Sequence, residues 1–456
     1  MEDDSSLIEG LKNDPLSIID ENPELTTLIL ATKLQNEDNS SLSSKILSKL
    51  SRGYTCYTVV KIISYSFAET AFILPYCLKT VGILPYCLGL ILISLISFYF
   101  FYIQMDLVIK FNLFQKYHGI LKENLSRKFT LVYYIINILY HSLILILGSY
   151  IFLYFIIKLL SLFDFGMGDN IIYYAIILLE LVLVQFPLSF INYLNKPDLL
   201  FIIFIIFFFL LNIISFFFFI IYRYKNEDNK STMNFFEEIN TDYFTCFSVL
   251  FNIIGWQNQI SRQLEEFKIK TTRRFFNILY LTFILEILFC LIIGLVNVPL
   301  MVNNEQKIFI INYNEEIIPT LMIKIVLIIC CVLINVLISY RVKLIEENFI
   351  LLLEVTIYKS SPNNTKKINK ITIAIFKLFI LLLCSLINLV INEISYIVIL
   401  FGGILANILN FLFPTIIYSK LISKNNLVIK IAFLLSIFVI IINFIGLVLK
   451  IIFESI

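Results

Sequence analysis

Residues 64–82, SYSFAETAFILPYCLKTVG, interrupt an otherwise apolar segment of the chain. The centre of this stretch carries hydroxyls, the carboxylate of Glu69 and, further on, Pro75. A carboxylate deep in a bilayer is costly unless it faces protein or water, so it marks a candidate functional site. Hydroxyls and a proline favour a break in a helix, which a membrane tolerates where the freed backbone groups line a protein-enclosed cavity. The stretch therefore predicts a first membrane helix that is broken in its middle.

The composition is that of a multi-pass membrane protein embedded in a lipid bilayer. Hydrophobic residues make up 59% of the 456 residues and charged residues 15%, against roughly 45–50% and 25% in soluble domains. The mean hydropathy is +0.90. A net charge of +2 gives no reason to expect a nucleic-acid partner. The eight cysteines form no CxxC pair and there are two histidines, so we expect no metal, no cofactor and no enzyme active site.

Eleven stretches are apolar and long enough to span a bilayer. They are 55–78, 82–109, 130–158, 171–193, 198–222, 242–260, 275–299, 318–340, 371–392, 396–419 and 427–449. Cytoplasmic loops hold an excess of Lys and Arg. With the N-terminus inside, the segments on that side at 33–52, 110–128, 194–197, 261–274, 341–370 and 420–426 carry 23 of these residues, and the opposite side carries seven. We therefore predict an all-α membrane protein with about eleven transmembrane helices, a cytosolic N-terminus and a C-terminus on the other face.

Residues 1–54 are polar and precede the first predicted span. They contain no apolar region of the signal-peptide type, so we expect a disordered cytosolic tail. Two pieces, DDSSLI (3–8) and ELTTLI (24–29), match the acidic-dileucine pattern that sorting adaptors read. That pattern also occurs by chance. The plasma membrane and a vacuolar or endosomal membrane both stay open as locations.

The sixth predicted span, DYFTCFSVLFNIIGWQNQI (242–260), starts apolar and turns polar at Asn252, Gly255 and Gln257. By the charge asymmetry, spans one and six run in opposite directions. Two interrupted helices in corresponding positions of two halves indicate an inverted-repeat transporter whose site lies near the bilayer midplane. We predict a transporter domain at 55–449, with repeats at 55–222 and 242–419, an extra helix at 427–449 and a short non-cytosolic tail at 450–456.

Five motifs in the membrane region point to a known family. They are FILPYCLKTVG (72–82), QFPLSFINYL (185–194), FNIIGWQNQISRQLEEF (251–267), LIIGLV (291–296) and FGGILANILNFLFPTIIYSKL (401–421). In this order the motifs resemble those of the amino acid/auxin permease family, whose first helix carries LPYxxxxxG. The resemblance implies a LeuT-like 5+5 inverted repeat with broken helices 1 and 6. It also implies secondary active transport of amino acids, with H+ or Na+ as the coupling ion.

Two departures from the family pattern stand out. The family has GxG before the LPY proline, where this chain has Ala68, Glu69 and Thr70. Where the family has SYP in its eighth span, this chain has Ser339, Tyr340 and Arg341. The first departure leaves the substrate and the coupling ion open.

The candidate site lies between spans one and six, with contributions from spans three and eight. Carbonyls and helix-end dipoles at a broken helix can hold the charged ends of an amino acid, and hard cations prefer oxygen ligands. The candidate substrate-binding residues are Ser64, Tyr65, Ser66, Ala68, Glu69, Thr70, His141, Asn252, Gly255 and Gln257. The candidate ion-coupling residues are Glu69, Asn335 and Ser339.

Each of these predictions has a structural alternative. Serine and threonine hydroxyls in an ordinary helix bond back to the preceding turn, and the polar residues of span six can join helices together. Glu69 would exchange a proton with the transport pathway or hold a substrate ammonium, whereas a static ion pair with Lys61 is its structural alternative. Glu180 and Glu286, deep in spans four and seven, are expected to pair internally or to face water.

The sequence therefore predicts a secondary transporter of amino acids that works by alternating access and is not an enzyme. Two alternatives stay open. A carrier of polyamines or other organic cations would find a natural partner in Glu69. A nutrient receptor or scaffold that kept the transporter fold would use its tail and loops for signalling, and the replaced GxG pair favours it.

Overall fold

The computed structural model describes residues 55–67, 69–110, 126–163, 180–190, 198–225, 234–255, 272–300, 307–313, 318–357, 370–390, 393–421 and 427–454. The chain divides into two units, Met1–Tyr57 and Thr58–Ile456. The predicted tail at 1–54 lies outside the described residues. The contacts described below all lie within the second unit.

The described part of the chain is about 92% helical and contains no strand, which confirms the predicted all-α class. The longer helices are α4 (Thr55–Phe67), α5 (Leu74–Val81), α6 (Ile83–Lys110), α8 (Arg127–Ser161), α11 (Asp198–Lys225), α12 (Asp242–Ile254), α14 (Thr272–Asn297), α15 (Thr320–Ile357), α16 (Lys370–Val390), α18 (Phe413–Leu421) and α19 (Leu427–Glu454). The short elements are η1 (Glu69–Phe72), η2 (Glu180–Gln185), α10 (Phe186–Leu188), η4 (Val298–Leu300), η5 (Phe309–Asn312), α17 (Ile394–Val398), η6 (Ile399–Leu405) and η7 (Ile408–Leu412).

Seven of the described helical segments are long and apolar enough to cross a membrane, as an integral membrane protein requires. They are α6, α8, α14, α15, α16, the segment Ile394–Leu421 and α19, and they match predicted spans two, three and seven to eleven. The other four predicted spans contain shorter described pieces: α4 with α5, η2 with α10, the apolar part of α11, and α12. The count of eleven crossings and the inverted repeat stay predictions.

The first predicted span is interrupted, as expected. α4 ends at Phe67, the 3-10 segment η1 follows, and α5 begins one residue before Pro75. Proline has no N–H to donate to the preceding turn, so an α-helix cannot continue unchanged through it. The Thr70 hydroxyl donates to the carbonyls of Ser66 at 3.1 Å and Phe67 at 2.9 Å. Because a helix end leaves its last carbonyls without backbone donors, Thr70 stabilises the break.

Gly82 makes the turn from α5 into α6. Its φ of +84° is readily adopted only by glycine, and its N–H donates to the Leu78 carbonyl at 3.0 Å. A Cβ at this position would also lie 3.0 Å from the backbone of Phe235. The glycine therefore turns the chain and lets the segment before α12 pack directly on the turn.

The sixth predicted span also stops early. α12 ends at Ile254, and the N–H of Gly255 still donates to the Phe251 carbonyl at 2.8 Å. The Gly255 carbonyl accepts a hydrogen bond from the side-chain amide of Asn410 in η7. A side chain from another element thus satisfies the carbonyl that follows α12. Residues 256–271 lie outside the described residues.

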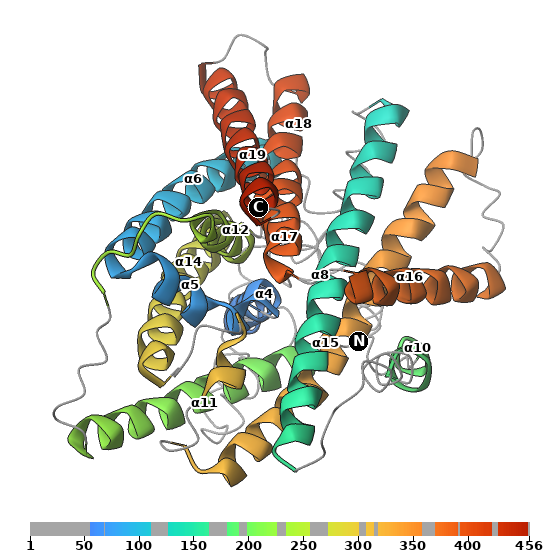
Figure 1. Ribbon diagram of the computed structural model, residues 1–456. Coiled ribbons are helices and arrows are strands. Elements are labelled where there is room, and N and C mark those ends of the chain that lie inside the picture. Colours follow the sequence, from blue (N-terminus) through green and yellow to red (C-terminus); the bar gives the residue numbers. More distant parts are fainter. Residues whose placement is uncertain are drawn as a thin grey trace, which may run out of the picture. The chain divides into compact units, whose positions relative to one another are not determined.

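α8 and α15 lie side by side and form the most extensive helix–helix interface (Figure 1). Gly148 of α8 allows the close approach, because a Cβ there would lie 3.0 Å from the Ile338 side chain of α15. α15 continues to Ile357, beyond the predicted end of span eight at residue 340. Arg341, which the sequence assigned to a cytosolic loop, is therefore a helical residue with 3% exposure. Without Arg341, the segments predicted to be cytosolic still carry far more Lys and Arg than those on the other face.

Helix ends that the predicted topology places on one face do meet. The Tyr418 hydroxyl of α18 donates to Asp106 of α6 at 2.6 Å. Arg127, at the start of α8, donates to the carbonyls of Val355 at 3.0 Å and Thr356 at 2.6 Å, near the end of α15. These contacts agree with the predicted alternation of the helices, while the side that faces the cytosol stays a prediction.

Two features near the C-terminus differ from the predictions. The tenth span contains two π-helical segments, η6 and η7, which hydropathy does not reveal. Gly402 in η6 faces the Ser248 carbonyl of α12 and leaves room for the two backbones to approach, as small residues do between membrane helices. α19 runs to Glu454, so Lys450 lies in this helix and not in a separate tail.

Candidate functional site

A buried ion pair lies at the break of the first span. Arg341 of α15 donates from Nε to Glu69 Oε1 at 3.1 Å and from Nη2 to Oε2 at 2.9 Å. The side chains of Arg341 and Glu69 are 3% and 2% exposed. Two parallel charge-assisted hydrogen bonds fix both orientation and distance. The structure thus gives Glu69 a cation from span eight, whereas the sequence considered Lys61 as its structural partner.

The guanidinium is held against the last turn of α4. Nη2 lies 3.4 Å from the Tyr65 carbonyl, and the Cζ atom is 4.4 Å from the centre of the Tyr65 ring. The Tyr340 ring meets the Tyr65 ring edge-on, with 6.0 Å between centroids. Among the described residues, Nη1 of Arg341 has no hydrogen-bond partner. The site therefore contains a buried, positively charged nitrogen whose donor capacity no described residue uses.

Residues of spans three and six adjoin the break. η1 contacts both α8 and α12. Tyr140 of α8 donates to Asn252 of α12 at 2.8 Å. The His141 ring is 5.1 Å from the Tyr140 ring. η1, α8 and α12 thus meet in one buried region, in which Tyr140 contacts the predicted residues His141 and Asn252.

The hydroxyls of the first span already have acceptors nearby. Ser64 donates to the Val60 carbonyl at 2.7 Å, as the structural alternative expected. Ser66 donates to the Ile63 carbonyl at 3.0 Å and to Glu286 of α14 at 2.8 Å. The internal pairing expected for Glu286 is therefore observed. Two further predicted site residues, Ala68 and Gln257, lie outside the described residues.

Asn335 and Ser339 are hydrogen-bonded to Gln185, and their role in ion coupling with Glu69 stays a prediction. Ser339 donates to Gln185 Oε1 at 3.2 Å, and the Gln185 amide donates to Asn335 and, at 2.8 Å, to Glu180. Ser339 and Arg341 are two positions apart on α15, so they point to opposite sides of the helix. The side-chain oxygens of Asn335 and Ser339 thus lie around Gln185, together with the Glu180 carboxylate.

Sequence reasoning missed three residues of these clusters: Arg341, Tyr140 and Gln185. The sequence did offer a clue to Arg341, because this residue stands where the family has the proline of SYP. Glu69 likewise lies in the segment that departs from the family's GxG. The two departures are in contact in the structure. Tyr140 and Gln185 carried no such signal, since one lies in an aromatic-rich helix and the other is the first residue of the quoted motif QFPLSFINYL, whose match to the family is PLS.

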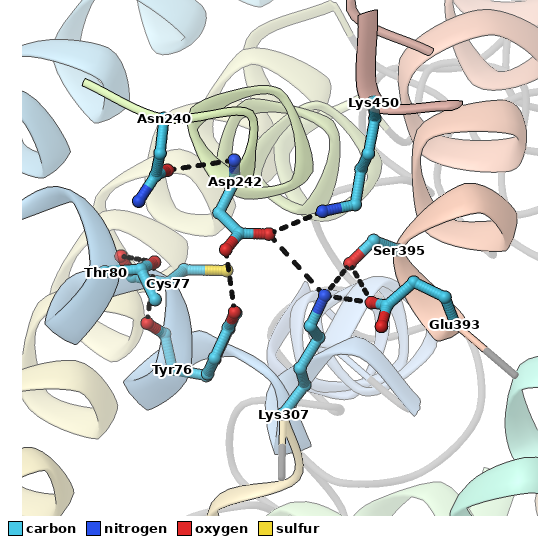
Figure 2. A network of polar contacts seen from close by, with 9 residues as sticks. All are labelled: Tyr76, Cys77, Thr80, Asn240, Asp242, Lys307, Glu393, Ser395 and Lys450. Atoms are coloured by element: carbon cyan, nitrogen blue, oxygen red, sulfur yellow. Dashed lines mark hydrogen bonds and ion pairs between the residues drawn. The ribbon is translucent and has the colours of Figure 1, made fainter. Parts of the chain in front are cut away.

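A second polar network joins the other ends of the helices (Figure 2). Asp242, at the start of α12, accepts from Tyr76 at 2.9 Å and from Lys450 at 2.8 Å. Lys307 lies 3.5 Å from the same carboxylate and also contacts Glu393. All of these residues fall at ends that the predicted topology assigns to the non-cytosolic face. The network therefore ties α5, α12 and α19 together on that face.

Comparison of the chain with models of known protein families finds no match, and comparison with curated proteins finds none either. The resemblance to the amino acid/auxin permeases accordingly rests on the quoted motifs, and membership of that family stays a prediction.

Proposed function

We propose that this protein is a secondary transporter for amino acids or similar small zwitterions, working by alternating access in the plasma membrane or in a vacuolar or endosomal membrane. The observation that carries the proposal is the interruption between α4 and α5, which lies against α12 and holds a buried ion pair. A membrane helix is broken in this way where protein encloses the break and a pathway passes it.

The chemistry of the break suits a zwitterion. The end of α4 presents carbonyls and the start of α5 presents N–H groups, so opposite partial charges face each other across η1. Glu69 and Arg341 add a full charge of each sign at the same place. A molecule with one ammonium and one carboxylate finds a complement for both of its ends.

The network around Asp242 supplies a gate for alternating access. It links α5, the second half of the broken span, to the start of α12 and to Glu393, next to α17. Opening a pathway between these helices on that face requires the ion pairs of Lys307 to break. In this proposal, the described conformation corresponds to a state that is closed on the predicted non-cytosolic face.

Coupling to H+ or Na+ is part of the proposal. Glu69 already has a cation beside it, whereas Glu180 is 8% exposed and its hydrogen-bond partner is the neutral amide of Gln185. A desolvated carboxylate without a cation favours binding of a proton or a metal ion. Glu180 is therefore the second candidate for the coupling residue, in addition to Glu69. The side-chain oxygens of Asn335 and Ser339 hydrogen-bond to the same glutamine, Gln185.

Uptake of labelled amino acids into vesicles that contain the purified protein tests the proposal. Tyr140→Phe removes the hydroxyl that donates to Asn252 and should lower the uptake rate. Tyr313→Phe is the matched control, because Tyr313 is a buried tyrosine that hydrogen-bonds to Asn297 at 2.7 Å and to Ser215 at 2.9 Å, and to no residue of the candidate site in the described part of the chain. We expect the control to transport at the wild-type rate.

The outcomes separate the alternatives. Uptake of polyamines in place of amino acids supports the organic-cation carrier. Uptake of neither solute, with tight binding of an amino acid, supports a receptor that kept the fold. Equal uptake rates for Tyr140→Phe, Tyr313→Phe and wild type would mean that the Tyr140 hydroxyl does not take part in transport.

A further inference from the structure

The unused donor of Arg341 defines a ligand position. A guanidinium carries five N–H donors. Nε and Nη2 donate to Glu69 and to the Tyr65 carbonyl, whereas both hydrogens of Nη1 lack an acceptor among the described residues. The residue is 3% exposed, so bulk solvent has little access to it. A buried donor left unsatisfied is costly, and more so when it is charged.

We propose that Arg341 is the carboxylate anchor of the transport site: its Nη1 donates to the carboxylate of a zwitterionic substrate, while Glu69 accepts from the substrate's ammonium. The inference rests on the proposed transport function and specifies its substrate class. Each Glu69 oxygen accepts one hydrogen bond from Arg341 and keeps further acceptor capacity. Substrate and ion pair then form a ring of four charges with alternating sign.

Charge balance favours a zwitterion over an organic cation. The Glu69–Arg341 pair is neutral as a unit, and a zwitterion adds no net charge to it. A polyamine would bring positive charge beside Arg341, would compete with it for Glu69 and would leave Nη1 unfilled. A carboxylate fills Nη1 without breaking either existing hydrogen bond.

The surroundings hold Arg341 for this role. The Tyr65 ring lies 4.4 Å from Cζ and limits rotation of the guanidinium plane. Gly148 faces the pair from α8, where a Cβ would already lie 3.5 Å from Cγ of Glu69. The absence of a side chain at Gly148 leaves the Glu69 stem room beside α8. The anchor is thus positioned before the substrate arrives.

The test compares an amino acid with analogues that lack the carboxylate. The probe is whichever proteinogenic amino acid the wild type carries, with its carboxamide and its decarboxylated amine as competitors. For wild type we expect the amino acid to compete at least about tenfold better than the carboxamide, which is the value of one charge-assisted hydrogen bond. Ligand-induced thermal stabilisation of the purified protein provides a second readout that does not depend on transport.

The decisive variant is Glu69→Gln/Arg341→Gln, which removes both charges and so avoids a lone buried ion. It should raise KM at least about tenfold and abolish the preference for the carboxylate over the carboxamide. Arg341→Lys keeps the positive charge beside Glu69, so it tests the anchor even if the double variant misfolds. It should also lose the preference for the carboxylate over the carboxamide. The matched control is Glu346→Gln/Lys377→Gln, a second ion pair with a 2.8 Å contact, which should leave the preference unchanged.

Each outcome decides one of the two proposals. Uptake without a preference for the carboxylate, or a preference that survives the double variant, overturns the role of Arg341 and leaves transport intact. Carboxylate-dependent stabilisation that requires Arg341, without uptake, supports the anchor and overturns transport. Neither uptake nor stabilisation by any amino acid overturns both.

Discussion

Replacing Arg341 by glutamine measures how strongly the buried ion pair holds the broken helix in place. The change removes the cation that lies 2.9 Å from Glu69. The carboxylate left behind is 2% exposed, so bulk water stabilises it little, and Arg341 is its ion-pair partner among the described residues. Removing one partner of a buried pair costs about 3–5 kcal/mol. We expect Arg341→Gln to lose stability in this range.

The double variant Glu69→Gln/Arg341→Gln should recover most of that loss. It removes both charges, and two amides can hydrogen-bond to each other, so the cost of desolvating ions disappears. With roughly 1–2 °C per kcal/mol for a chain of this length, the single variant should unfold roughly 3–10 °C below wild type. The double variant should unfold within roughly 3 °C of wild type on the same scaling.

The assay is thermal unfolding of the detergent-purified variants, followed by their intrinsic fluorescence. Lys343→Gln is the control on the same helix, because its partner Glu347 is 3.9 Å away and the two side chains are 27% and 34% exposed. Such pairs contribute about 0–1 kcal/mol, so this variant should unfold near wild type. A single variant as stable as wild type, or a double variant no more stable than the single one, would refute the reasoning.

Three further predictions address coupling, gating and topology. Glu180→Gln should abolish any pH dependence of uptake, because it keeps the hydrogen bond with Gln185 and removes the proton-binding group; uptake that keeps its pH profile assigns coupling elsewhere, with Glu69→Gln as the next variant to measure. Asp242→Asn removes the counter-ion of Lys450, whose side chain is 2% exposed, and should speed labelling of a single retained Cys77 by an impermeant maleimide; an unchanged labelling rate argues against a gate. Tags at the two chain termini should be protected from protease on opposite faces of the membrane, and protection of both on one face would mean an even number of spans.

The sequence by itself determined where helices lie and where two of them stop. Hydropathy located the long helices because burying apolar side chains in a bilayer depends on composition, not on partners. The break between α4 and α5 follows from Thr70 and Pro75, whose effects reach the carbonyls one turn away. The end of α12 at Gly255 is similarly local, although the donor from Asn410 comes from elsewhere in the chain.

Only the tertiary structure decided which charges meet at the break. Arg341 and Glu69 are 272 residues apart, and neither segment contains information about the other. Hydropathy ended span eight at residue 340 because an arginine there is costly without a counter-ion, and Glu69 removes that cost. The rotation of α15 then decides that Arg341 faces Glu69 while Ser339 faces Gln185, and the close packing against Gly148 holds that rotation.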